Sequence, residues 1–189
     1  MKKQLFNLKN KIVVITGGSG FLGSEFSFSL SDIGAIPVIL DKNKTSLEIL
    51  KKKFTKKRKK GSILNIASDY GIISPDHRIY EPNKKINYKG VNFNTPISYS
   101  VAKSGIISMT KYLATYWAKK GIRVNCVSPT GVSKQKQDKQ FVKQLSERIP
   151  LGRMAKSDEL NGAIIYLCSN ASSYVTGHNL VVDGGRTIW

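Results

Sequence analysis

Short apolar runs alternate with helical segments along the 189-residue chain. Five runs have the length and continuous apolar character of strands that are covered on both faces. The predicted strands are 11–16 (KIVVIT), 36–41 (IPVILD), 62–68 (SILNIAS), 123–129 (RVNCVSP) and 178–183 (HNLVVD). Helices are predicted near 21–33, 44–58, 98–120, 136–148 and 157–170. This alternation predicts an α/β fold built on a parallel sheet.

The segment 74–96 breaks the alternation, because its three prolines and several asparagines predict a loop. The sequence has no internal repeat and no linker between domains. Its length and its 40% content of hydrophobic residues are sufficient for one folded core. We therefore expect residues 1–189 to form a single domain.

The chain carries a formal net charge of +19, and eight of the ten residues from 51 to 60 are basic. This basic run (residues 51–60) follows a predicted helix, and lysines near a helix C-terminus suit the helix dipole. The sequence has neither zinc-finger spacing nor the aromatic signature of RNA-binding domains. We therefore interpret the basic run as a solvated helix end rather than a nucleic-acid site.

The sequence has no segment of the roughly 18 apolar residues that a membrane span requires. Its N-terminus is charged and lacks the apolar part of a signal peptide. We therefore expect a cytoplasmic protein that does not bind membranes. Cys126 and Cys168 lie in apolar segments and are expected to be buried thiols. His77 and His178 are far apart and lack supporting carboxylates, so no catalytic metal site is predicted.

A glycine-rich turn (residues 17–23, GGSGFLG) joins the first predicted strand to a helix. Glycines let such a turn be tight and let its backbone approach a pyrophosphate, while the N–H groups of the helix N-terminus bind phosphate. An ordinary glycine turn is the alternative. The predicted cofactor-binding residues are Gly17, Ser19, Gly20, Phe21, Leu22 and Gly23.

Asp41 ends the second predicted strand, 18 positions after Gly23. A carboxylate at this distance binds the hydroxyl groups of the adenosine ribose in dinucleotide-binding folds. The same negative charge repels a 2′-phosphate. We therefore expect NAD rather than NADP, although Lys42 beside the carboxylate weakens this preference.

Tyr99 and Lys103 lie near the start of a long predicted helix, where their spacing places phenol and ammonium on one face. The positive charge lowers the pKa of a neighbouring tyrosine, which suits proton exchange with a substrate near neutral pH. The same spacing recurs at Tyr80/Lys84 and Tyr116/Lys120. A proline follows Tyr80 closely and disfavours a helix there, and Tyr116 lies late in its helix. Tyr99/Lys103 is therefore the favoured pair.

These motifs belong to a longer ordered series that covers nearly the whole chain. The series comprises GGSGFLG at 17–23, NIASDYG at 65–71, Tyr99/Lys103, RVNCVSP at 123–129, LGR at 151–153, VTG at 175–177 and VDGG at 182–185. In this order the motifs resemble the short-chain dehydrogenase/reductase family, whose members are NAD(P)-dependent oxidoreductases. The resemblance implies a Rossmann-type, doubly wound parallel sheet.

The resemblance also implies roles for individual residues. Tyr99 is the proton donor or acceptor, Lys103 holds the nicotinamide ribose and tunes Tyr99, and Ser68 hydrogen-bonds the reacting oxygen. The loop residues Pro129, Gly131 and Val132 lie against the nicotinamide. Asp183-Gly184-Gly185 shapes the end of the last strand. Hydride then passes between NAD and the carbon of a small-molecule alcohol or carbonyl substrate.

The chain is similar to one subgroup in the long insertion between Ser68 and Tyr99, the SPTGV sequence at 128–132 and the short segment before Leu151. Its members are associated with flagellin modification and acylneuraminate-type sugar biosynthesis, which implies a sugar or sugar-nucleotide substrate. The loops that set the substrate, 74–96 and 132–150, carry no chemically unique signature. The exact substrate and the direction of the reaction therefore stay open.

The sequence departs from the family pattern in three places. The glycine turn is G-x-x-G-x-x-G, which is more usual in extended relatives, and Thr130 stands where a second glycine is common. The main departure lies between Leu50 and Ser62, where the family has a third strand, a fourth strand and a long helix that supplies a catalytic asparagine. At roughly 30 residues per βαβ unit, on the order of 60 residues are absent. We therefore expect an internal deletion near 51–61 and a sheet without its third and fourth strands.

The missing fourth strand normally separates the first strand from the fifth. Its loss either leaves a gap or brings those two strands together. The long helix also commonly contributes to the dimer interface, so the self-association usual in the family stays open. Three interpretations follow: a compact active enzyme, a shortened and catalytically impaired family member, or a non-catalytic protein that binds an acidic partner through the basic run.

Overall fold

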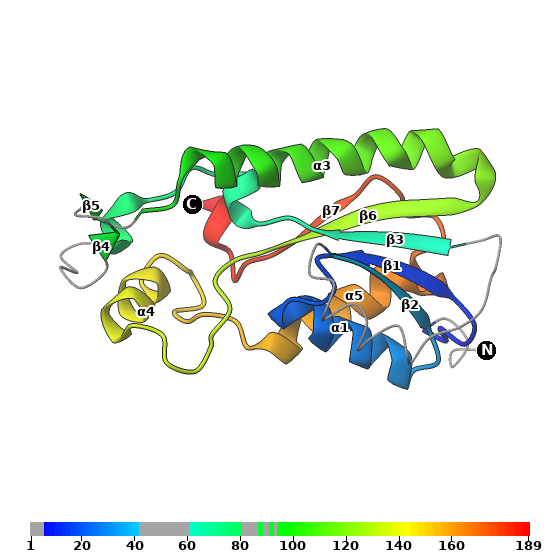
Figure 1. The fold of residues 1–189 in the computed structure, drawn as a ribbon, viewed down its shortest axis with the longest axis horizontal. Coiled ribbons are helices and arrows are strands. Elements are labelled where there is room, and N and C mark those ends of the chain that lie inside the picture. The colour runs from blue at the N-terminus through cyan, green and yellow to red at the C-terminus, as the bar shows by residue number, and fades with distance from the viewer. Residues whose placement is uncertain (1–5, 42–60, 81–86, 89–90, 93) are drawn as a thin grey trace.

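The computed structural model describes residues 6–41, 61–80, 87–88, 91–92 and 94–189 (Figure 1). Lys42, the predicted helix at 44–58, the basic run and the suspected deletion lie outside these ranges, apart from Gly61. The main sheet has five strands, all parallel, in the order β2-β1-β3-β6-β7. Their bounds are β1 Ile12–Thr16, β2 Ile36–Leu40, β3 Gly61–Ile66, β6 Ile122–Pro129 and β7 Asn179–Val182. Each lies within two residues of its predicted position, which confirms the parallel α/β fold.

The centre of the sheet answers the question raised by the missing strands. β1 pairs with β2 on one side and directly with β3 on the other, with Ile12 opposite Gly61 and Val14 opposite Ile63. The loss of the intervening strand has therefore brought its two neighbours together. No gap separates β1 from β3 in the part of the chain that the structure describes.

Helices cover both faces of this sheet, as in a doubly wound fold (Figure 1). α1 (Phe21–Asp32) and α5 (Asn161–Cys168) lie on one face, and α3 (Ile97–Trp117) crosses the other. α4 (Lys139–Ser146) lies beyond one end of the sheet, as does the antiparallel pair of β4 (Asn87–Tyr88) and β5 (Val91–Asn92). The connections at this end are therefore the ones available to build a site.

The main hydrophobic core lies between the sheet and the α1–α5 layer. Val13 and Ile15 of β1 and Leu64 of β3 contribute alternate side chains to it, as the period of a strand requires. The helices contribute Phe26, Leu30, Ile164, Leu167 and Cys168. On the other face, the Asn65 amide donates to the Thr110 hydroxyl at 2.9 Å, which joins β3 to α3 through a buried polar pair.

Three predicted segments differ from the structure in detail. α4 begins at Lys139 instead of 136, because Lys136 has a left-handed backbone (φ 64°) and the Asp138 carboxylate caps the helix. The predicted helix at 157–170 is a 3₁₀ turn (Ser157–Leu160) followed by α5. The predicted loop 74–96 contains a 3₁₀ turn (His77–Tyr80) as well as β4 and β5.

Within the described ranges, no helix combines the length and the apolar character needed to cross a membrane.

Candidate active site

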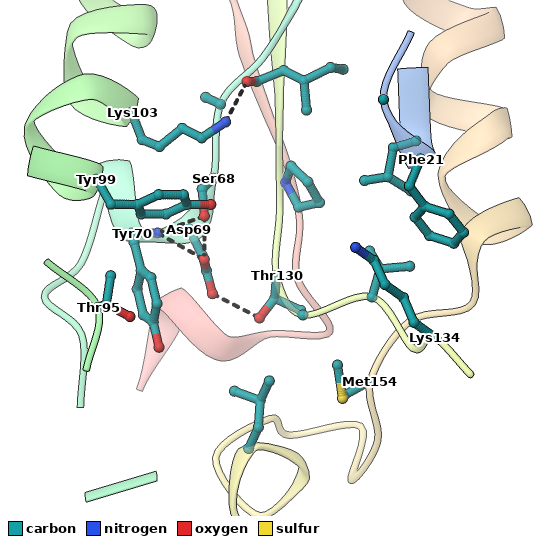
Figure 2. Close-up of a pocket in the computed structure, with 18 of the residues that line it drawn as sticks. Phe21, Ser68, Asp69, Tyr70, Thr95, Tyr99, Lys103, Thr130, Lys134 and Met154 are labelled. Carbon is teal, nitrogen blue, oxygen red and sulfur yellow. Dashed lines mark hydrogen bonds between the residues drawn. The ribbon is translucent and has the colours of Figure 1, made fainter. Parts of the chain in front are cut away.

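A cavity of about 590 Å³ lies at the carboxyl edge of the sheet, beyond the ends of β1, β3 and β6 (Figure 2). Ligands of open parallel sheets bind at this edge, because the connecting loops and helix N-termini converge there. Eleven of the predicted site residues line the cavity: Gly17, Gly20, Phe21, Leu22, Gly23, Ser68, Tyr99, Lys103, Pro129, Gly131 and Val132. Ser19 and Asp41 do not line it. The fold therefore brings together most of a set that is spread over 116 positions of the sequence.

The glycine turn forms one wall. Gly17 has a φ of 68°, which favours glycine, and a Cβ atom on Gly23 would lie 2.3 Å from the Gly17 carbonyl oxygen. No side chain caps the N-terminus of α1 at Gly20, and no acidic residue occurs in its first turn. The backbone N–H groups at this end can therefore receive an anion, so the turn fits the pyrophosphate of a dinucleotide.

Asp41 lies beside this turn, at the end of β2. Its half-buried carboxylate accepts a hydrogen bond from the Ser19 backbone N–H at 3.0 Å. The contact fixes a negative charge next to the glycine turn on the neighbouring strand. A carboxylate in this place fits the ribose hydroxyls of a dinucleotide.

Ser68 follows β3 and begins a 3₁₀ turn at Asp69–Gly71. Its buried hydroxyl donates to the Asp69 carboxylate at 2.8 Å and accepts from the Tyr70 backbone N–H at 3.3 Å. The turn packs on α3, where the Ser104 hydroxyl donates to the Gly71 carbonyl at 3.0 Å. These contacts hold Ser68 at the cavity wall next to the first turns of α3.

Tyr99 and Lys103 lie on those first turns. The Lys103 ammonium donates to the Ile66 carbonyl at 3.0 Å and lies 5.6 Å from the centre of the Tyr99 ring. Burial lowers the pKa of Lys103, because an ammonium loses hydration there. Figure 2 shows the Tyr99 phenol reaching into the cavity beside Ser68. The three predicted catalytic side chains are therefore neighbours on one wall.

The other two tyrosine–lysine pairs have different surroundings. Tyr80 lies in a 3₁₀ turn, where its hydroxyl and the Thr95 hydroxyl are hydrogen-bonded at 2.6 Å, and Lys84 is outside the described residues. Lys120 lies 5.3 Å from the centre of the Tyr116 ring, but both side chains are exposed and neither lines the cavity. Tyr99 and Lys103 are thus the pair that the fold brings to Ser68.

The two loops expected to set the substrate pack against each other at the far end of the cavity. The Tyr80 and Phe141 rings stack at 5.7 Å, and the Arg148 guanidinium contacts the Asp76 carboxylate at 2.5 Å. Hydrogen bonds from Arg78 and Arg148 lower the pKa of Asp76 well below its ordinary value. A buried cluster lies under these contacts and comprises Ile79, Leu145, Ile149 and Met154. Sequence reasoning had not assigned these wall residues.

Two further residues were missed, Asp69 and Arg186. Their side chains form a buried ion pair, with the Arg186 Nη1 atom 2.5 Å from the Asp69 Oδ2 atom. An acidic residue within the largely apolar sequence NIASDYGII is a signal of a buried partner. The partner itself lies 117 positions away, so sequence spacing could not identify it.

Lys134 was also missed. Its ammonium lies 4.7 Å from the centre of the Phe21 ring, and both residues line the cavity next to the glycine turn. A cation there complements the charge of a bound phosphate. Among the described residues, no three histidine, cysteine or acidic side chains are grouped so that they could hold a metal ion.

Comparison with known proteins gives the same picture. The family model described as enoyl-(acyl carrier protein) reductase matches residues 85–187, which is more than half of the chain. The crystal structure of a short-chain dehydrogenase from Leptospira borgpetersenii with bound NAD+ has a TM-score of 0.76 and 31% identity. That match covers 96% of this chain and 94% of the other. A gluconate 5-dehydrogenase from Burkholderia cenocepacia, in complex with NADP and tartrate, shares the fold at 21% identity with a TM-score of 0.75, and the match covers 99% of each chain.

Among curated relatives, 2-dehydro-3-deoxy-D-gluconate 5-dehydrogenase from Bacillus subtilis is 33% identical over 155 residues, which are 78% of this chain and 54% of the relative. The chain spans only 24% to 54% of the length of the curated relatives that it matches. The family model nevertheless matches more than half of the chain, and the Leptospira structure shares its fold at 31% identity. The chain belongs to the short-chain dehydrogenase/reductase family.

Proposed function

We propose that the chain is an NAD(H)-dependent oxidoreductase that interconverts a hydroxyl and a carbonyl group. One observation carries the proposal: Ser68, Tyr99 and Lys103 lie together on a cavity wall that continues to the glycine turn. Dehydrogenases and reductases among the relatives support this class of reaction.

The side chains of this wall can have the following roles in the reaction. Ser68 and Tyr99 hold the reacting oxygen of the substrate, and the Tyr99 phenol releases or takes up its proton. The Lys103 ammonium, 5.6 Å from the Tyr99 ring, stabilises negative charge that develops on the phenol. Gly17–Gly23 and the loop residues Pro129, Gly131 and Val132 would hold the nicotinamide cofactor, which supplies or accepts the hydride when bound.

Asp41 supports NAD as the cofactor. Its carboxylate is fixed by the Ser19 N–H group, and a 2′-phosphate placed against it would meet like charge. We expect the replacement Asp41→Ser to lower affinity for NAD and to narrow the difference between NAD and NADP. Equal use of both cofactors by the unaltered chain would contradict this part of the proposal.

A polyhydroxylated substrate, namely a sugar or sugar-nucleotide, fits the far end of the cavity. Tyr70, Tyr80 and Thr95 present hydroxyl groups there, and the stacked Tyr80 and Phe141 rings offer apolar faces to carbon-bound hydrogens. The gluconate-type substrates in the names of the relatives belong to the same chemical class.

The test is a substrate screen on the purified full chain. Formation of reduced cofactor is followed by absorbance with NAD and, separately, NADP, over a panel of polyols, sugar acids and sugar nucleotides. We expect NAD-dependent oxidation of at least one panel member, with kcat lowered by about a thousandfold in the Tyr99→Phe variant. A folded chain that binds NAD but oxidises no member and reduces no matching carbonyl would overturn the assignment.

A further inference from the structure

The hydroxyl group of Tyr70 has a defined hydrogen-bonding role at the cavity wall. The Nη2 atom of Arg186 donates to the Tyr70 oxygen at 3.0 Å, and the guanidinium lies 4.7 Å from the centre of the Tyr70 ring. A guanidinium only donates hydrogen bonds, so the phenol oxygen is the acceptor in this contact. The phenol hydrogen is left for another acceptor, and no group in the part of the chain that the structure describes accepts it.

Arg186 is itself held in place by buried contacts. Its Nη1 atom pairs with the Asp69 carboxylate, and the two side chains are only 5% and 3% exposed. The Asp183 carboxylate accepts from two backbone N–H groups of the turn that carries Arg186, at 2.9 and 2.7 Å. A guanidinium that is fixed in this way cannot turn toward a ligand in the cavity. Its effect on a ligand therefore passes through Tyr70.

The Tyr70 phenol keeps its hydrogen near neutral pH. Burial raises its pKa, and this effect outweighs the opposite effect of Arg186. The hydrogen bond from the guanidinium also polarises the phenol, because successive hydrogen bonds strengthen one another in a buried setting. Tyr70 is therefore a neutral side chain that donates strongly.

The ring of Tyr70 packs edge-on against the ring of Tyr99, with the planes at 84° and the centres 6.3 Å apart. The two tyrosines therefore belong to one wall of the cavity. Figure 2 shows the Tyr70 hydroxyl at the end of its ring that lies away from Ser68 and Tyr99. This donor is thus placed for a part of the substrate other than the reacting carbon.

The charges that line the cavity favour an anionic group on the substrate. The charged residues of the lining, among those that the structure describes, are Asp69, Lys103, Lys134 and Arg186. Asp69 is paired with Arg186, so the other two charges are both positive. No unpaired carboxylate of the described residues lines the cavity, and a substrate anion meets no like charge from them.

A carboxylate is the anionic group that fits Tyr70 best. A hydrogen bond to an ionised acceptor is roughly twice as strong as one between neutral groups, so a carboxylate gains more from this donor than a hydroxyl does. A phosphate group carries up to about two negative charges and suits direct contact with a cation. The nearest cation directs its Nη atoms to Asp69 and Tyr70 instead.

We propose that Tyr70 is a specificity-determining residue that donates a hydrogen bond to the carboxylate of a sugar-acid substrate, and that Arg186 is the positioning residue that fixes this donor. The inference rests on the proposed function, because it narrows the substrate class of that reaction. The proton transfer by Tyr99 is unaffected, because a carboxylate has no proton to exchange. The test needs one measurement that does not depend on turnover and one that does.

The first measurement is isothermal titration of the purified full chain, with NADH present and again without cofactor. The probes are linear sugar acids of four to six carbons, each compared with the alditol and the alditol phosphate of the same carbon skeleton. We expect at least one sugar acid to bind about tenfold or more tightly than its alditol. Equal affinities, tighter binding of the alditol phosphate, or no binding by any sugar acid would overturn the proposal.

Tyr70→Phe keeps the ring and removes the donor. It should weaken binding of the sugar acid about tenfold and leave binding of the alditol within about twofold. Tyr174→Phe is the matched control, because it removes the hydroxyl of an exposed tyrosine outside the cavity lining and should change neither affinity. Losses of equal size for the two probes in Tyr70→Phe would show a disturbed wall and would contradict a role in recognising the carboxylate.

The role of Arg186 is tested by Arg186→Lys, which keeps a cation opposite Asp69 and removes the second donor. We expect about threefold weaker binding of the sugar acid when Tyr70 is present, and no further loss when the change is added to Tyr70→Phe. A further loss in the Tyr70→Phe background would make Arg186 merely structural.

The second measurement is the steady-state rate with the sugar acid that the unaltered chain oxidises fastest. Tyr70→Phe should raise KM about tenfold and leave kcat within about threefold, because the carboxylate is held equally in the ground state and the transition state. A fall in kcat with unchanged KM would argue against a role in substrate recognition. Absence of turnover in the unaltered chain would refute the proposed function, while the binding measurements would still decide the role of Tyr70.

Discussion

The two edges of the parallel sheet differ sharply, although α3 and the 3₁₀ turn that follows it (Ala118–Lys120) carry the same tyrosine–lysine pair to each of them. At the carboxyl edge, Lys103 lies 5.6 Å from the ring of Tyr99, and at the amino edge Lys120 lies 5.3 Å from the ring of Tyr116. The distance from lysine nitrogen to tyrosine ring is therefore nearly the same in the two pairs. Their surroundings are not.

At the carboxyl edge, neighbouring residues hold Tyr99 and Lys103 in place and add further side chains to the cavity wall. Lys103 is half-buried and bonded to the Ile66 carbonyl, and the Ser68 turn packs beside Tyr99. Tyr116 is 61% exposed, and among the described residues its ring meets Tyr112, Trp117 and Lys120, all within the same helix and the 3₁₀ turn that follows it. Residue spacing alone is therefore enough to bring a tyrosine and a lysine together. Only at the carboxyl edge, where the loops after parallel strands converge, is that pair surrounded by other residues of a site.

The largest expected effect separates the two tyrosines. Tyr99→Phe removes the proton-transferring hydroxyl and should lower kcat by about a thousandfold, the scale of general acid–base catalysis. Tyr116→Phe should leave kcat within about twofold of the unaltered chain. Steady-state rates with NAD and the best panel substrate measure both. Similar losses of kcat in the two variants would contradict a catalytic role that is specific to the carboxyl edge.

The next effect concerns the glycine turn at the carboxyl edge. A Cβ atom at Gly23 would lie 2.3 Å from the Gly17 carbonyl oxygen, so Gly23→Ala must displace α1 or the turn. We expect loss of NAD binding and a lower thermal midpoint. Gly162→Ala in α5, where a Cβ atom would meet nothing within 4 Å, should bind NAD normally and be as stable or slightly more stable. Isothermal titration with NAD distinguishes the two variants.

A smaller effect is expected where the two substrate loops meet. Asp76→Asn removes the contact with Arg148 and should raise KM while changing kcat little. Hydrogen bonds from Arg78 and Arg148 lower the pKa of Asp76, so its stabilising contribution is present above the ordinary pKa of about 3.9. That contribution is lost as pH falls through the lower pKa of the folded chain. Thermal midpoints of Asp76→Asn and the unaltered chain should therefore converge in acid, and a constant difference would contradict this origin.

The smallest effect is the change of folding stability with pH that the buried Lys103 causes. Burial lowers the pKa of Lys103 in the folded chain, so the unfolded chain binds more protons between that value and about 10.4. Lys103 therefore destabilises the fold while protonated, and stability rises with pH across this window. Lys103→Met should flatten that rise. Urea unfolding at several alkaline pH values measures the slopes, and identical slopes would contradict the burial of Lys103.

Much of this architecture was readable from the sequence. Each strand of the main sheet is a continuous apolar run flanked by turn residues. This pattern predicts a strand of a parallel sheet, because both faces of such a sheet are covered by helices. The G-x-x-G-x-x-G turn and Asp41 predicted two neighbouring strand ends, and the structure joins them through the Ser19–Asp41 contact. The proline close to Tyr80 and the late position of Tyr116 in its helix favoured Tyr99 among three tyrosines, and Tyr99 lines the cavity together with Ser68.

The direct pairing of β1 with β3 could be foreseen only as one of two outcomes. Nothing in the apolar pattern of 62–68 states which strand lies beside it, because pairing partners are set by the whole sheet. The Asp69–Arg186 pair and the stacking of Tyr80 on Phe141 join segments far apart in sequence, so they depend on the fold itself. The hairpin of β4 and β5 was missed because two-residue strands leave almost no periodic signal.

The central claim is that a sheet with β1 paired directly to β3 still builds a dinucleotide site. A thermal-shift titration of the full chain with NAD, and separately with NADP, tests it most directly at fixed moderate salt. The account predicts a cooperative transition whose midpoint rises with NAD, reaching about 2.7 kcal/mol of stabilisation at a hundred times the dissociation constant. NADP should shift the midpoint less. A cooperative transition that neither cofactor moves at any concentration would contradict the claim.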